Sequence, residues 1–254
     1  MSAAPSPLLM FDFDGVLVDG MPEYWWSARR SALRLDPALS LPEEVPSAFR
    51  RLRPLIHKGW EMVLMAAELA RPDFAVEAAL GSYDAVLRAA LVRSARSPQQ
   101  IQALLEDCRR QAIADDAAAW LGLHRFYPGV PERLRRLADE GCEWAVLTTK
   151  GRDFASGILA AAGLRPAAVH GHEQGSKPEV LLRLLGRQPL RPLWFLEDRR
   201  PTLELVRDTA GLEPVRCYLV AWGYLAPGDR QGLAATGIRW LDQAGFVAPL
   251  ADWP

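Results

Sequence analysis

The chain has little cysteine, no long apolar run and almost no net charge, and each shortage excludes a class of protein. Its three cysteines are odd in number and widely separated, which disfavours a disulfide scaffold and indicates reduced thiols in a cytoplasm. No apolar run reaches the roughly 18 residues of a membrane span, and the first residues lack the pattern of a signal peptide. A net charge of −1 offers no polyanion-binding surface. We therefore expect neither a nucleic-acid partner nor a membrane partner.

The second half of the chain has the pattern of an α/β protein. Half of the 254 residues are hydrophobic, which is enough for a sizeable core. After residue 125, short apolar runs alternate with helical patterns, and the runs near 145–148, 167–170, 193–197, 217–221 and 238–241 are predicted strands. This alternation predicts a doubly wound parallel sheet, in which ligands bind outside the carboxyl ends of the strands.

The segment 21–124 has a different hydrophobic pattern. Strand-like runs vanish there, and Ala, Leu and Arg recur at helical spacing over 48–70, 75–95 and 98–121. The sequence therefore predicts two domains: an α/β core of residues 1–20 and 125–254, and an all-helical domain of residues 21–124 inserted after the first strand.

Two carboxylates follow the first apolar run. Asp12 and Asp14 come directly after the run 8–11 and are followed by Gly15. Because side chains two apart on a strand point the same way, both carboxylates would converge at the carboxyl end of this strand. Such a pair shares a proton or binds a hard cation such as Mg²⁺, and Gly15 lets the backbone turn away. We favour a chemical role, although the same letters occur in ordinary turns.

A hydroxyl pair and a lysine follow in the second half. Thr148 and Thr149 end the strand near 145–148, where a hydroxyl beside the next helix could hold a phosphate; Thr148 could instead cap the helix that begins near Arg152. Lys177 stands where a helix is expected to begin, with Pro178 in its first turn.

The rarity of lysine makes Lys177 more informative. Only three of the thirty basic residues are lysines, namely Lys58, Lys150 and Lys177, and two of these fall at the predicted phosphate site. A compact ammonium fits between a phosphate and a carboxylate where a planar guanidinium would not. The alternative, a solvated surface lysine, remains open at this stage.

After the two carboxylates, the hydroxyl pair and the lysine, a fourth motif is an acidic pair. Glu197 and Asp198 end the apolar run near 193–197.

These four motifs, in this order, resemble those of the haloacid dehalogenase superfamily. The helical insertion resembles the helical (C1-type) cap of its phosphatase and phosphoglycolate-phosphatase-like branch. The resemblance covers residues 7–19 and 126 to about 250. It implies Mg²⁺-dependent hydrolysis of a small phosphorylated metabolite, with a cap that excludes water and supplies substrate contacts.

The resemblance also assigns roles. Asp12 would be the nucleophile that forms a phospho-aspartate, and Asp14 would act as general acid and base. Asp12, Asp14 (through its carbonyl) and Asp198 would hold Mg²⁺, with Glu197 behind them or acting through water. Thr148, Thr149 and Lys177 would bind the phosphate. Since Thr202 supplies no carboxylate, it departs from the pattern of many family members.

Within the helical segment, Arg53, His57 and Glu61 are spaced to share one helical face and are candidate substrate-specificity residues. An ordinary polar stripe fits the same spacing, and Pro54 and Gly59 point to a break in the helix.

Two other functions remain open. A sugar phosphomutase shares all four motifs, and a binding protein could keep the fold without turnover. A dehalogenase is disfavoured because it needs no acid at Asp14. The substrate and the oligomeric state are left open by the sequence.

Overall fold

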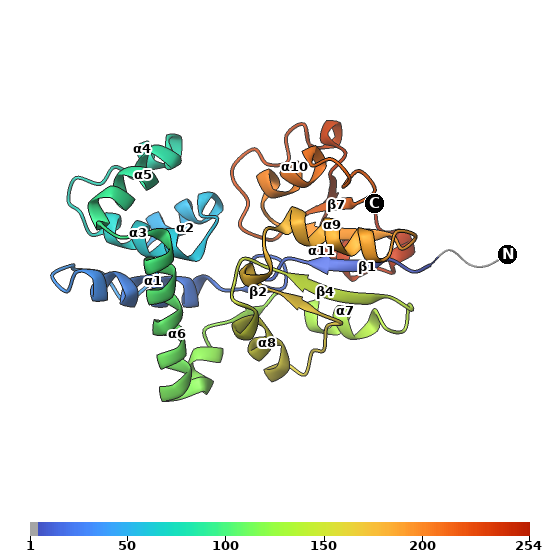
Figure 1. The fold of residues 1–254 in the computed structure, drawn as a ribbon, viewed down its shortest axis with the longest axis horizontal. Coiled ribbons are helices and arrows are strands. Elements are labelled where there is room, and N and C mark those ends of the chain that lie inside the picture. Colours follow the sequence, from blue (N-terminus) through green and yellow to red (C-terminus); the bar gives the residue numbers. More distant parts are fainter. Residues whose placement is uncertain (1–4) are drawn as a thin grey trace. The chain divides into compact units, whose positions relative to one another are not determined.

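The computed structural model describes residues 5–254, which form two compact units (Figure 1). One unit contains the residues up to Asp19 together with Phe126–Pro254, and the other contains Gly20–Arg125. We refer to them as the α/β unit and the helical unit.

The α/β unit is built on a parallel sheet of six strands in the order β5-β4-β1-β6-β7-β8. The strands are β1 (Leu8–Phe11), β4 (Glu143–Leu147), β5 (Val169–His170), β6 (Leu193–Glu197), β7 (Arg216–Val220) and β8 (Arg239–Leu241). The two-residue strands β2 (Val18–Asp19) and β3 (Arg125–Phe126) pair with each other. Every strand pair of the large sheet is parallel, so the predicted parallel α/β fold is confirmed.

Helices cover both faces of this sheet. They are α7 (Val130–Arg136), α8 (Arg152–Ala161), α9 (Lys177–Arg187), α10 (Arg200–Asp208) and α11 (Gln243–Val247). Met10 shares a buried cluster with Val180 of α9 and Leu203 of α10, while the next residue, Phe11, packs edge-on against Phe246 of α11. Because successive side chains of a strand point to opposite faces, β1 is buried on both sides. A fully apolar strand is therefore required here.

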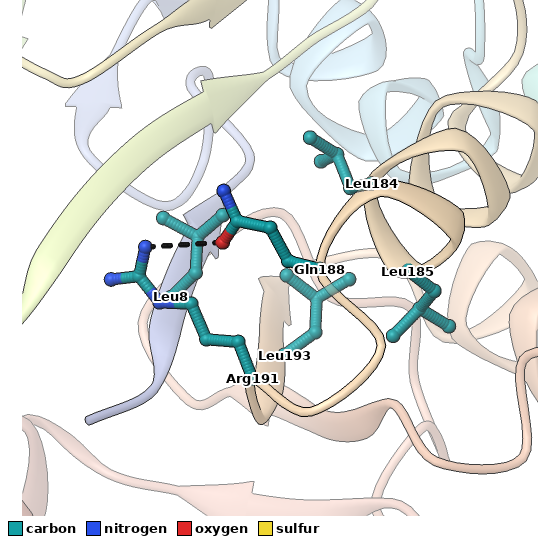
Figure 2. Close-up of a pocket in the computed structure, with 6 residues that line it drawn as sticks. All are labelled: Leu8, Leu184, Leu185, Gln188, Arg191 and Leu193. Atoms are coloured by element: carbon teal, nitrogen blue, oxygen red, sulfur yellow. Dashed lines mark hydrogen bonds between the residues drawn. The ribbon is translucent and has the colours of Figure 1, made fainter. Parts of the chain in front are cut away.

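The amino ends of β1 and β6 border a small apolar hollow, shown in Figure 2. Its lining is Leu8, Leu184, Leu185, Gln188, Arg191 and Leu193, and the Arg191 guanidinium donates a 3.4 Å hydrogen bond to Gln188. No carboxylate lines it. The predicted carboxylates Asp12 and Glu197 lie elsewhere, at the opposite ends of the same two strands.

The helical unit contains α1 (Met21–Leu35), α2 (Ser47–Leu52), α3 (Gly59–Leu69), α4 (Val76–Gly81), α5 (Tyr83–Ser94) and α6 (Pro98–Leu121). Helix α6 starts at the predicted position because Ser97 and Gln100 form a capping box and Pro98 fits the first turn. Within residues 5–254, no helix combines the length and apolarity that crossing a membrane requires.

The expectation that Arg53, His57 and Glu61 share one helical face is wrong. Helix α2 ends at Leu52, a 3₁₀ turn spans Arg53–Leu55, and α3 begins at Gly59. The Arg53 guanidinium lies 4.6 Å over the ring of Tyr24 and donates a hydrogen bond to its hydroxyl. Glu61 is buried and accepts hydrogen bonds from the His57 backbone N–H and the Tyr83 hydroxyl. Pro54 lacks the N–H that a continuous helix needs, so the chain breaks there.

Candidate active site

Asp12 and Asp14 lie directly beyond the carboxyl end of β1, and both are buried, with 7% and 5% of their surface exposed. Gly15 follows with a φ of +93°, a left-handed conformation that favours glycine. A Cβ at Gly15 would lie 1.9 Å from Asp198 Oδ2, so no larger residue fits. The close approach of this turn to Asp198 therefore requires the glycine.

Lys177 is the first residue of α9. Ser176 and Glu179 form a capping box ahead of it, and Pro178 fixes the first turn. The Lys177 ammonium lies 2.8 Å from Asp12 Oδ1 and 2.5 Å from Glu197 Oε2. With 8% of its surface exposed, Lys177 is not a solvated surface lysine.

Glu197 and Asp198 end β6, the strand beside β1. One Glu197 oxygen accepts the backbone N–H groups of Asp198 and Arg199, each at 3.1 Å. Asp198 Oδ2 accepts the backbone N–H of Tyr224 at 2.7 Å. Carboxylate oxygens of Asp12, Glu197 and Asp198 lie within 4.8 Å of one another and form a group that could bind a metal ion. Hard divalent cations prefer such oxygen ligands.

Thr148 and Thr149 follow β4 on the other side of β1. Thr148 is buried, and its hydroxyl accepts the backbone N–H of Lys150 at 3.0 Å. The residue that precedes α8 is Gly151, without a side-chain cap, so the alternative that Thr148 caps this helix is wrong. Thr149 is half-buried.

Two contacts of the site were not predicted from the sequence. Lys150 is buried with its ammonium 3.4 Å from Asp14 Oδ2; the rarity of lysine was the signal for it. The loop after β7 also contributes, because a Cβ at Gly223 would lie 2.2 Å from Asp198 Cβ, and the next residue, Tyr224, donates to Asp198.

Arg53, His57 and Glu61 belong to the helical unit, and their role in specificity stays a prediction. Thr202 is a buried residue of α10, and its hydroxyl accepts a 3.4 Å hydrogen bond from Arg199.

The electrostatics of the site reflect crowded negative charge. Burial, with the Glu197 carboxylate beside it, raises the pKa of Asp12 to about 7 against the opposing effect of Lys177. Burial also raises the pKa of Glu197 to about 7, although Lys177 opposes this and Asp198 adds to it. Burial disfavours the charge of Lys177, but Asp12 and Glu197 outweigh this and raise its pKa above the ordinary value.

The charge count fits a divalent cation. Six ionisable side chains are buried around Asp12: the carboxylates of Asp12, Asp14, Glu197 and Asp198, and the ammonium groups of Lys150 and Lys177. If all are ionised, the carboxylates exceed the cations by two charges, and uncompensated buried charge is costly. A divalent cation among Asp12, Glu197 and Asp198 would balance this excess.

The family model for haloacid dehalogenase-like hydrolases matches residues 7–199. No curated protein is similar enough in sequence to count as a match.

Solved structures share the fold at low sequence identity. A protein of Clostridium acetobutylicum described as a predicted phosphatase is 15% identical, with a TM-score of 0.59 and 94% of each chain covered. A predicted phosphoglycolate phosphatase of Haemophilus somnus is 17% identical, again with a TM-score of 0.59 and 94% of each chain covered. A protein of Thermotoga maritima, whose assignment as a β-phosphoglucomutase is itself a prediction, is 18% identical, with a TM-score of 0.55 and coverage of 95% of this chain and 96% of that one.

Proposed function

Because the chain belongs to the haloacid dehalogenase-like hydrolases, we propose that it hydrolyses a small phosphomonoester through a phospho-aspartate on Asp12. The observation that carries this proposal is the gathering of Asp12, Lys177 and the Glu197–Asp198 pair, which come from three distant parts of the chain and lie buried together. Ligands of doubly wound sheets bind at this end of the strands.

Asp12 is the nucleophile of the proposed reaction. Its carboxylate attacks phosphorus and forms an acyl phosphate, which splits one difficult hydrolysis into two easier steps. Lys177, 2.8 Å away, neutralises this carboxylate and can also reach the phosphate oxygens. Thr148 and Thr149, at the end of β4, are the proposed hydroxyl and backbone contacts of the same phosphate.

Asp14 is the proposed general acid and base. It protonates the leaving alkoxide in the first step and activates water in the second. In support, Asp14 Oδ1 is buried, and it has no hydrogen-bond partner among residues 5–254. Buried polar atoms in folded proteins almost always have partners. Asp14 Oδ1 would have its partner, the oxygen of the leaving group, only during the reaction.

The donor set also fits Mg²⁺. Asp12, Glu197 and Asp198 offer oxygen ligands within 4.8 Å of one another, and we propose that they hold the ion together with the backbone carbonyl of Asp14. When bound, Mg²⁺ would supply charge neutralisation on the transferred phosphoryl group. Lys177, which contacts both Asp12 and Glu197, would remain the cation beside the nucleophile.

The test is a screen of phosphorylated metabolites with and without Mg²⁺, with Asp12→Asn as the control variant. We expect Mg²⁺-dependent phosphate release from at least one small monoester, and a loss of more than about a hundredfold in kcat for Asp12→Asn, because removing a nucleophile costs several powers of ten. An unchanged fold of this variant, read from its circular dichroism, separates lost chemistry from lost structure. Phosphate release that survives Asp12→Asn contradicts the mechanism.

A sugar phosphomutase is the second candidate. The likeness in fold to the T. maritima protein described as a β-phosphoglucomutase is the observation that keeps it open, since fold alone does not separate the two reactions. Incubation with hexose 1-phosphates and analysis of the sugar products distinguishes them: isomerised sugar phosphate indicates a mutase, and free sugar with inorganic phosphate indicates a phosphatase.

A further inference from the structure

Lys150 is the one residue of the six buried charged groups around Asp12 to which the proposed mechanism gives no role. It follows β4 and Thr148, only 4% of its surface is exposed, and its ammonium lies 3.4 Å from Asp14 Oδ2. Its backbone N–H is fixed by the Thr148 hydroxyl at 3.0 Å. Lys58, by contrast, is exposed at the start of α3 in the helical unit.

The two oxygens of Asp14 have different surroundings. Oδ2 faces the Lys150 ammonium, whereas Oδ1 is buried and has no hydrogen-bond partner in the part of the chain that the structure describes. A general acid needs this asymmetry, because one oxygen must be held while the other is aimed at the group that receives the proton. A carboxylate that turned about its axis would spend time with both oxygens in unproductive positions.

We propose that Lys150 is a positioning residue that holds Asp14 Oδ2 and thereby aims Oδ1 at the leaving-group oxygen. This inference rests on the proposed function. An ammonium suits the task because it is compact and lies 3.4 Å from one carboxylate oxygen, whereas a guanidinium would bind the carboxylate through both oxygens and block the reacting one. The chain, which otherwise uses arginine for most of its basic residues, has lysine at this position.

The kinetic test uses leaving groups that differ in their need for a proton. p-Nitrophenolate leaves without one, and phenolate benefits from one. We expect Lys150→Met to lower kcat/KM for p-nitrophenyl phosphate by about threefold or less and for phenyl phosphate by about thirtyfold or more, because general-acid assistance is worth about 10²–10⁴. Lys150→Gln, which keeps a donor but no charge, should be intermediate, and it replaces the Met variant if that variant does not fold.

Arg165→Met is the matched control, since it removes an exposed positive charge from the same unit. It should leave both esters unaffected. Equal losses on the two esters in Lys150→Met, or no loss on either, overturn the proposal, because a role in the fold alone would not depend on the leaving group.

A second readout does not need turnover. In a crystal structure of metal-free Lys150→Met or Lys150→Gln, we expect the Asp14 carboxylate to leave its present position or to occupy two conformations. An Asp14 that keeps a single unchanged conformation overturns the proposal. If the wild type releases phosphate from no monoester in the screen, the proposed function fails, and this structural result still decides whether Lys150 positions Asp14.

Discussion

Each unit of the molecule contains a group of buried charged side chains, and the two groups are built differently. In the helical unit, Arg109 donates to both oxygens of Glu23 at 2.7 and 2.8 Å, and both side chains are almost fully buried. His124 lies beside them, with its Nε2 3.9 Å from Glu23 Oε2. In the α/β unit, four carboxylates surround two ammonium groups, and one oxygen of Asp14 has no hydrogen-bond partner within residues 5–254.

The difference separates structural from chemical use of buried charge. The charges of Glu23 and Arg109 cancel, and the bidentate geometry satisfies both groups, which is how a buried pair supports a fold. The group around Asp12 has an excess of negative charge and raised carboxyl pKa values. Such an arrangement costs stability unless a ligand completes it, and perturbed groups of this kind cluster at functional sites.

The largest expected effect concerns the structural pair. Arg109→Met leaves Glu23 buried without its partner and should lower the free energy of unfolding by about 3–5 kcal/mol. Chemical denaturation measures this. Arg110→Met is the control, because Arg110 is exposed and its contact with Glu106 is 3.7 Å long; it should change stability by less than about 0.5 kcal/mol. A similar small change for Arg109→Met would contradict the structural role of the pair.

Lys177→Arg sharpens the comparison from the chemical side. The wider guanidinium cannot occupy the space between Asp12 and Glu197, which the ammonium contacts at 2.8 and 2.5 Å. We expect a loss of at least about tenfold in kcat/KM, or about 1.4 kcal/mol of transition-state binding, measured with the substrate that the screen identifies. Wild-type kinetics for this variant would contradict the proposed role of Lys177 beside the nucleophile and the phosphate.

The raised carboxyl pKa values predict a pH-dependent effect of Mg²⁺ on stability. The pKa of Asp12 rises from 3.8, and that of Glu197 from 4.5, each to about 7 in the folded chain. Between about pH 4 and pH 7 the folded state therefore binds more protons than the unfolded state, and this contribution to stability falls as the pH rises. Above about pH 7 the penalty is complete, and a bound cation relieves it.

We therefore expect saturating Mg²⁺ to raise Tm more at pH 8 than at pH 5. The corresponding increase in the free energy of unfolding should be larger at pH 8 by on the order of 1 kcal/mol or more. Thermal unfolding in EDTA and in Mg²⁺ at both pH values measures this. If Mg²⁺ raises the Tm of Arg109→Met by the same amounts at the two pH values, the effect belongs to the site and not to the helical unit. An increase in Tm that is equal at both pH values would contradict the link between these carboxyls and the metal.

The smallest expected effect is that of Arg53→Ala. Arg53 stacks on Tyr24 and bonds its hydroxyl, so its main role in the helical unit is packing. If it also reads the substrate, the variant should raise KM for the natural substrate severalfold and barely change turnover of p-nitrophenyl phosphate, because contacts to remote parts of a substrate matter only when those parts exist. Equal losses on both substrates would assign Arg53 to packing alone.

Much of the α/β unit could be predicted because its signals are local. Strands β1, β4, β6 and β7 each contain an apolar run bounded by polar or turn residues, and strand β6 has the predicted bounds, 193–197. The start of helix α6 is as predicted for the same reason, since Ser97, Pro98 and Gln100 specify it within four residues, although the helix is kinked at Asp116. Motif residues at strand ends were correspondingly easy to place.

The missed features depend on contacts between distant residues. The ion pair of Lys150 with Asp14 requires β4 to lie beside β1 with Phe11 opposite Val146, and a sequence does not state its strand register. The break at Arg53 was signalled by Pro54, but the packing of Arg53 on Tyr24 that replaces the helix was not. The close approach of Gly223 and Tyr224 to Asp198 likewise depends on the end of β7 lying beside the end of β6.

The central claim is that Asp12 becomes phosphorylated during turnover. Rapid acid quenching of the enzyme with its substrate and Mg²⁺, followed by borohydride reduction, converts an aspartyl phosphate to homoserine, which mass spectrometry of the peptide locates. We expect homoserine at position 12, with none in a sample without substrate and none in Asp12→Asn. Homoserine at another aspartate, or unmodified Asp12 during active turnover, would contradict the account.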